Sequence, residues 1–389
     1  MKHKSLLMAL VILMPAAAAG AEIVNKDGNK LDLYGQLNGV HYFSSDADNN
    51  GDRSYTRFGF KGETQIADGL TGYGQWEYQA GLDQPESAGP GNSYTRLGFA
   101  GLTFGHWGSL DYGRNYGLLY DVAGWTDVLP EFGNDSYEAA DNFMTGRANG
   151  LLTYHNRSLG GLLDGLDLGL QYQGKNRGDD ALRAKDIQTQ NGDGYAFSAT
   201  YDTGAGLNFG AAYANSARTL AQQRFGLADG DRARAWTLGL KYDLDNLYLA
   251  ASYARTENMT YVDGDRYAGF APRADAVEAV AQYHFDSGVT PSVAYLQTRG
   301  RNLPGIGDAD LVKYLDLALN YSFNANMSTY VEYKLNLLQR QNAVGGGGGG
   351  AGGAAGAGGG GGGGGWGGEK EGAGAAGNPP ARRGGRGGG

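Results

Sequence analysis

The sequence predicts an all-β fold, a transmembrane antiparallel β-barrel with a polar lumen. Residues 314–323, YLDLALNYSF, alternate almost without a break between polar and apolar side chains. Successive side chains of a strand point to opposite faces, so this segment has one apolar face and one polar face. The pattern recurs between residues 31 and 337 in runs of about ten residues, the length of a tilted strand that crosses a bilayer.

The first twenty residues have the features of a secretory signal peptide. Lys2 and Lys4 give a positive start, residues 6–14 form an apolar core, and small residues precede a cleavage site before Ala21. Nine apolar residues are too few for a membrane anchor, which needs about 20. No later segment has enough apolar residues for a membrane helix, so we expect export through the periplasm and membrane residence as a barrel.

Composition limits the possible functions. The chain has no cysteine, which excludes disulfides, thiol catalysis and cysteine metal sites, and the sequence indicates no metal site and no cofactor. Without the signal and the tail, the chain carries 26 basic and 39 acidic residues, a net charge of about −13. In a pore this charge favours cations, and it argues against nucleic acid as a partner. The expected regions are a signal peptide (1–20), a barrel (21–344) and a disordered low-complexity tail (345–389).

Two further features favour a barrel over a soluble β-sandwich, whose strands would also alternate. The 26 Tyr and 13 Phe crowd the strand ends, as in the aromatic girdles at membrane interfaces. Short turns also alternate with long polar loops, as in outer-membrane barrels.

The longest early interruption of the polar–apolar alternation is residues 115–142, which are rich in acidic and aromatic residues. Trp125 and Phe132 argue against disorder in this segment, because they can bury surface. A loop of this length in a compact fold is usually functional.

Two motifs in and before this loop carry a family resemblance: SLDYGRNYG at 109–117 and WTDVLPEFG at 125–133. With AEIVNKDGNKLDLYG at 21–35 and LTGYGQWEY at 70–78, they resemble the Gram-negative general diffusion porins, most closely the OmpC-like osmoporins of enteric bacteria. The resemblance covers residues 21 to about 338. It implies a homotrimer of sixteen-stranded outer-membrane barrels, each with loop three folded inward, that passes small hydrophilic solutes passively. Outer-membrane lipid, lipopolysaccharide and the barrel-assembly machinery are the other implied partners.

The same resemblance implies a pore constriction in which loop carboxylates face a ladder of arginines. The residues that carry over are Asp127, Glu131 and, as a weaker third, Asp135 on the loop, with Arg57, Arg96 and Arg147 on the wall. Opposite charges across a narrow pore produce a transverse field that aligns polar solutes. From the residues alone, these would be ordinary loop or surface charges.

Two other positions concern selectivity and assembly. Where the family usually has a lysine in the first strand, this chain has Gln36. One positive charge is therefore missing from the wall, and we expect a stronger cation preference than in relatives. Glu86, in the second long loop, matches the latch residue that reaches into a neighbouring subunit, although an exposed loop acid is common.

The end of the chain departs from the family pattern, in which a last strand with a terminal aromatic residue closes the barrel. Here the alternation stops near Leu338, and the tail has 27 Gly in 45 residues. Glycine loses the most backbone entropy on ordering and offers no side chain to lipid, so we expect about 15 strands with the closing strand missing. Unpaired backbone groups cost several kcal/mol each in hydrocarbon, so such a barrel is not expected to close or insert normally.

Three interpretations of the tail are a frameshifted reading frame, a flexible linker and an Arg-Gly RNA-binding segment, and export argues against the last.

For the barrel region, residues 21–344, there are three alternatives to a general diffusion porin. An enzyme is disfavoured because His106, His155 and His284 lie in no recognisable nucleophile motif. A sugar-specific porin would need a path of aromatic residues, and residues 112–125 supply only a partial one. The remaining alternative is a non-functional truncated product.

Overall fold

The computed structural model describes residues 21–44, 50–88, 93–176, 187–224, 230–264, 266–338, 344 and 352–360. The predicted signal peptide lies outside these residues. Within the described residues, eighteen strands form one sheet and two more form a separate hairpin. None of the helices in the described ranges has the length and apolar character needed to cross a membrane.

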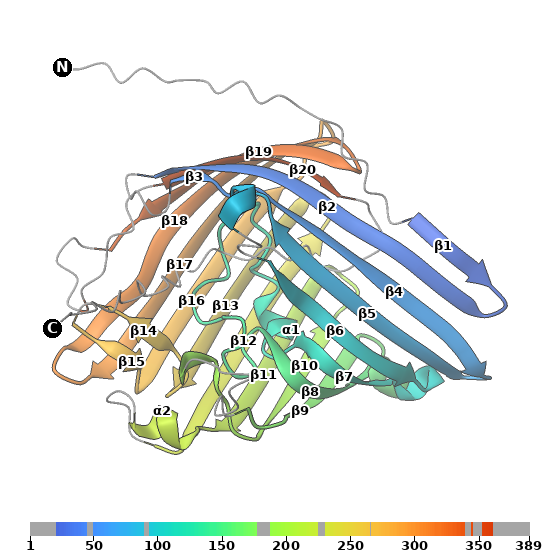
Figure 1. Ribbon diagram of the computed structural model, residues 1–389, viewed down its shortest axis with the longest axis horizontal. Helices are drawn as coiled ribbons and strands as arrows, with labels where there is room; N and C mark the ends of the chain where they lie inside the picture. The colour runs from blue at the N-terminus through green and yellow to red at the C-terminus, as the bar shows by residue number, and fades with distance from the viewer. Residues whose placement is uncertain are drawn as a thin grey trace, which may run out of the picture.

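The large sheet closes on itself as a barrel (Figure 1). β1 (Ala21–Lys26) and β3 (Gly51–Asp52) pair only with β2, and the other sixteen of the eighteen strands form the closed ring, each antiparallel to both neighbours. In ring order these are β2 (Asn29–Ser44), β4 (Tyr55–Ala67), β5 (Leu70–Gly81), β6 (Tyr94–Thr103), β7 (Ser109–Tyr116), β8 (Arg147–Asn156), β9 (Leu166–Gln173), β10 (Gly194–Asp202), β11 (Leu207–Ala217), β12 (Arg232–Leu244), β13 (Leu247–Glu257), β16 (Arg273–Tyr283), β17 (Val289–Leu303), β18 (Gly307–Asn324), β19 (Met327–Asn336) and β20 (Gly352–Gly360).

The connections carry the remaining elements. The two-stranded hairpin lies in the loop between β13 and β16, and short helices lie in six of the other connections of the described residues. These elements are β14 (Tyr261–Asp263), β15 (Ala268–Phe270), α1 (Tyr120–Ala123), α2 (Leu220–Arg224), η2 (Glu86–Ala88), η3 (Gly105–Trp107), η4 (Ser158–Gly161) and η5 (Ile187–Thr189).

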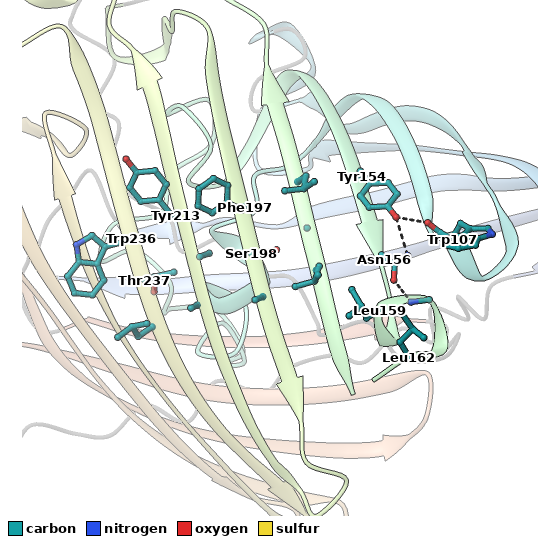
Figure 2. A pocket seen from close by; sticks show the side chains of 18 residues that line it. Trp107, Tyr154, Asn156, Leu159, Leu162, Phe197, Ser198, Tyr213, Trp236 and Thr237 are labelled. Atoms are coloured by element: carbon teal, nitrogen blue, oxygen red, sulfur yellow. Dashed lines mark hydrogen bonds between the residues drawn. The ribbon is translucent and has the colours of Figure 1, made fainter. Parts of the chain in front are cut away.

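The predicted division between an apolar outer face and a polar inner face is confirmed in β18. Leu317 and Leu319 point out of the barrel, with 47% and 54% of their surface exposed, whereas Asp316, the neighbour of Leu317, is fully buried inside. The outer wall of β8–β12 has the same character. Figure 2 shows Phe197, Tyr213 and Trp236 around a shallow outer pocket of about 800 Å³. The barrel is therefore apolar outside and polar inside, the reverse of a soluble protein.

The predicted absence of a closing strand is wrong. β20 pairs with both edges of the barrel, from Lys334 to Ser328 of β19 and from Ser44 to Gln36 of β2 (Figure 1). Strand pairing uses backbone N–H and C=O groups, which glycine has like any other residue. Ordering a glycine costs roughly 0.5–1 kcal/mol more than ordering an alanine, whereas each unpaired backbone group in hydrocarbon costs several kcal/mol. Closure therefore outweighs the poor strand propensity, and the barrel has the sixteen strands that the resemblance implied.

The same result corrects the expected disorder of the tail at residues 352–360, which form β20. Residues 345–351 and 361–389, where the rest of the predicted tail falls, lie outside the described part of the chain.

Candidate functional site

The connection between β7 and β8, residues 117–146, folds into the barrel, and α1 lies inside the ring of strands in Figure 1. Glycines on two adjacent wall strands make room for it. A Cβ atom on Gly210 of β11 would lie 2.6 Å from the Trp125 ring, and one on Gly239 of β12 would lie 2.5 Å from Val122 Cγ1. The two missing side chains form a slot that seats the start of this inner loop against the wall.

Side chains of three wall strands hold the backbone of the inner loop. The Tyr248 hydroxyl of β13 donates to the carbonyl of Trp125 at 2.6 Å. Gln282 Nε2 of β16 donates to the carbonyl of Val128 at 2.9 Å. Thr298 of β17 donates to the carbonyl of Ser136 at 2.5 Å. Because backbone groups in a loop have no ladder of their own, these contacts satisfy them and fix the path of the loop.

Two buried wall carboxylates bind the same loop. Glu332 of β19 accepts the backbone N–H of Glu131 at 2.6 Å and that of Phe132 at 2.9 Å. Glu278 of β16 accepts the hydroxyl of Thr126 at 2.5 Å and the backbone N–H of Ser136 at 3.3 Å. Glu278 thus holds the two ends of the segment from Thr126 to Ser136, and Glu332 holds its middle.

The three predicted loop carboxylates have different surroundings. Asp127 accepts the Tyr120 hydroxyl at 2.7 Å, so this bond lies within the loop. Glu131 accepts the hydroxyl of Tyr42 from β2 at 2.5 Å and that of Tyr330 from β19 at 3.0 Å.

Asp135 is an anchor of the loop. It accepts the Tyr314 hydroxyl at 2.7 Å and forms a 2.9 Å ion pair with Lys334, both on the barrel wall. A lysine of the barrel wall therefore offsets the charge of Asp135.

The three predicted arginines lie together on the wall of β4, β6 and β8, and all are buried. Arg96 and Arg147 both act electrostatically on Arg57, which shows that they share one region. Arg57 Nε donates to Gln79 Oε1 at 2.7 Å, and an Arg147 amino group donates to the Tyr116 hydroxyl at 3.0 Å.

Sequence analysis missed the partner of one arginine. Arg96 sits in a β-bulge, where the register shifts between Glu77 and Tyr78, and its Nε lies 2.6 Å from Glu77 Oε1. A bulge redirects the side chain of the extra residue. No short-range sequence signal indicated this pair, because its members lie on different strands.

Glu138, which was also not among the predicted residues, lies near both the loop carboxylates and the wall arginines, because both Asp127 and Arg147 influence it. Burial and the charge of Asp127 raise the pKa of Glu138 well above its ordinary value, while Arg147 and a hydrogen bond from Asn134 oppose the shift. This carboxyl therefore adds a titratable group to the loop, beside the acids predicted from the sequence.

The last two predicted positions are on β2 and in the second long loop. Gln36 faces Arg57 directly in the register of β2 and β4, on the inner side of the wall. Glu86 begins the short helix η2 and is exposed. Neither position contacts the inner loop in the hydrogen bonds of the described residues.

Comparison with known proteins agrees with this architecture. The family model described as "Gram-negative porin" matches residues 26–349. The chain belongs to the Gram-negative porin family. Outer membrane protein F of Serratia marcescens is 56% identical to this porin over 87% of the chain and 93% of that protein. Outer membrane porin C of Rahnella aquatilis is 55% identical over 82% of the chain and 94% of that protein.

The solved structures give the same result. The OmpF porin of Salmonella typhi, solved in complex with daunomycin, matches this porin with a TM-score of 0.79 and 45% identity, over 86% of the chain and 98% of that structure. The family and the fold predicted by resemblance are confirmed. The protein is an outer-membrane β-barrel channel of the general diffusion type.

Proposed function

We propose that this porin prefers cations and that its selectivity is set where the inner loop meets the arginine wall. The observation that carries the proposal is that the loop acids and the wall arginines share one buried region. The guanidinium of Arg57 lies 4.8 Å from the centre of the Tyr55 ring on β4. Tyr55 packs against the cluster that contains Tyr42, whose hydroxyl donates to the Glu131 carboxylate. A lumen in which carboxylates face guanidinium groups has a transverse field that orders polar solutes.

Two further observations favour cations over anions. The chain without signal and tail carries a net charge of about −13. Within the wall, Glu77 neutralises Arg96, and the position opposite Arg57 is the uncharged Gln36. Fewer uncompensated positive charges therefore face the loop acids.

Reversal potentials in a KCl gradient across a planar bilayer test this proposal. Asp127→Asn should lower the ratio of potassium to chloride permeability, and Arg57→Gln should raise it, by roughly twofold each. Asp243→Asn, an exposed acid at the end of β12, is the matched control and should leave the ratio unchanged. The proposal fails if Asp127→Asn behaves like the control.

The role of Gln36 needs a separate variant. Gln36→Lys would place a positive charge opposite Arg57 and should move selectivity toward anions. Unchanged selectivity in this variant would show that Gln36 does not account for the cation preference.

The alternatives are less well supported. Residues of the partial aromatic path are used in packing: Tyr116 and Tyr120 stack at 4.4 Å, and Trp125 fills the slot at Gly210. This supports general diffusion over a sugar-specific path, which would show saturable uptake of one sugar. Closure of the barrel by β20 supports a working channel over a truncated product.

Assembly as a homotrimer is part of the same proposal, with Glu86 as the latch. The exposure of Glu86 on η2 leaves its side chain available to a neighbouring subunit. Glu86→Ala should lower the temperature at which the trimer dissociates on semi-native gels, whereas Glu63→Ala, another exposed acid, should not. Binding of lipopolysaccharide and recognition by the assembly machinery stay predictions.

A further inference from the structure

One row of residues crosses the inner wall where α1 of the inner loop meets it. In the strand register, His155 of β8 pairs with Gly169 of β9, and Gly169 pairs with Ser198 of β10. His155 lies two residues after the buried, inward-facing Thr153, so it faces the lumen. Ser198 is buried, whereas its neighbour Phe197 is exposed on the outer face of the barrel (Figure 2).

Gly169 leaves a gap in this row that the inner loop fills. A Cβ atom on Gly169 would lie 2.4 Å from Ser198 Oγ and 2.8 Å from Leu118 Cδ2 of the loop. Through this gap Asp121 of α1 reaches the wall. Its Oδ2 accepts the Ser198 hydroxyl at 2.5 Å and lies 3.4 Å from His155 Nε2.

The charges around His155 come from three elements. Asp121 on α1, Asp111 on β7 and Arg157 just after β8 all act on the imidazole, and Asp121 is its hydrogen-bonding partner. The side chains of His155 and Asp121 are 40% and 31% exposed, so water in the lumen can reach both. A proton can therefore enter and leave this pair without opening the loop.

We propose that His155 is a specificity-determining residue that makes lumen charge, and the hold on α1, depend on pH. Histidine ordinarily titrates near pH 6.5. At a pH above the pKa of His155, the uncharged imidazole leaves the negative charge of Asp121 facing the lumen. In acid the imidazolium neutralises that charge and adds an ion pair that pins α1 to the wall. The inference rests on the proposed control of selectivity by lumen charges.

The test uses the purified porin in planar bilayers, with reversal potentials in a KCl gradient at about pH 7.5 and about pH 5.5. In the unaltered protein the permeability ratio should fall about twofold on acidification, as expected for one charge close to the ion path. His155→Gln should lose most of this change, leaving only the smaller effect of other groups such as Glu138. His155→Arg should also lose most of it and should have a lower ratio than the unaltered protein at about pH 7.5. His284→Gln, on an exposed histidine beyond β16, should titrate like the unaltered protein.

Asp121→Asn provides an independent test, because it removes the carboxylate that stabilises the imidazolium and should move the pH response of the ratio to lower pH. The inference is overturned if His155→Gln responds to pH like the unaltered protein, or if the response of Asp121→Asn does not move to lower pH. A failure of the proposed function would give a different result. Asp127→Asn would then leave the ratio of potassium to chloride permeability at about pH 7.5 unchanged, whatever the results for the His155 variants.

Discussion

The carboxylate of Glu332 accepts a 2.6 Å hydrogen bond from the backbone N–H of Glu131, 201 positions earlier in the chain. Tyr330, two residues before Glu332 on β19, donates to the Glu131 carboxylate at 3.0 Å. β19 is also the strand that pairs with β20 at the closure of the barrel. The strand that closes the barrel is therefore next to the strand that holds the tip of the inner loop, so closure and pore shape depend on each other.

Removing the Glu332 carboxylate should loosen the loop. Glu332→Ala leaves the buried N–H groups of Glu131 and Phe132 without acceptors, at a cost of about 1–3 kcal/mol each. We expect larger fluctuations of the open-channel current in single-channel recordings. Glu332→Gln keeps one acceptor oxygen and should fall between the unaltered protein and the alanine variant. Equal current noise in all three would rule out this role for Glu332.

A side chain in the slot should displace the loop. In Gly239→Ala the new Cβ would lie 2.5 Å from Val122 Cγ1, which forces the loop or the wall to move at a cost of about 1–3 kcal/mol. Single-channel conductance should change and the unfolding temperature should fall. Gly39→Ala is the matched control, because a Cβ on this strand glycine meets no atom within 4 Å. If the two variants behaved alike, the slot would have no role in seating the loop.

Closure by β20 predicts that a proline within it is damaging. Gly356 pairs with Tyr330 on one side and Val40 on the other, and proline lacks the N–H that such a ladder needs. Gly356→Pro should reduce the fraction of protein that migrates as a folded, heat-modifiable barrel. Gly377→Pro, later in the same glycine-rich tail, should have no effect. Equal yields of folded barrel from both variants would show that the barrel does not depend on β20.

Glu138 predicts a pH dependence of stability. Its folded-state pKa is raised by burial and by Asp127, so the folded state holds the proton at pH values where the unfolded chain has lost it. This contribution to stability is complete below the ordinary pKa and is lost as pH rises toward the folded pKa. Between about pH 5 and about pH 8, the unfolding temperature of the unaltered protein should fall more than that of Glu138→Gln. The exposed Glu63→Gln should follow the unaltered protein.

The inner loop shows how far sequence reasoning reaches. Resemblance placed Asp127 and Glu131 on the loop, and alternation predicted a polar inner face for the strands of the wall. Neither method could show that Glu332 binds the backbone of the loop, because that contact joins segments 201 positions apart. The Arg96–Glu77 pair was hidden for the same reason, since it depends on a bulge in the register of β5 and β6.

The sequence by itself determined which face of each strand meets lipid, because the two-residue period of a strand assigns Leu317 outward and Asp316 inward without any tertiary information. It also determined the family. Only the tertiary structure decided that the barrel closes and how the loop is held. Closure through β20 uses backbone groups, which glycine has like any other residue. The glycine-rich sequence argued against a strand here because it offers no side chains to lipid. Pairing with the open edges of β2 and β19 nevertheless stabilises the strand.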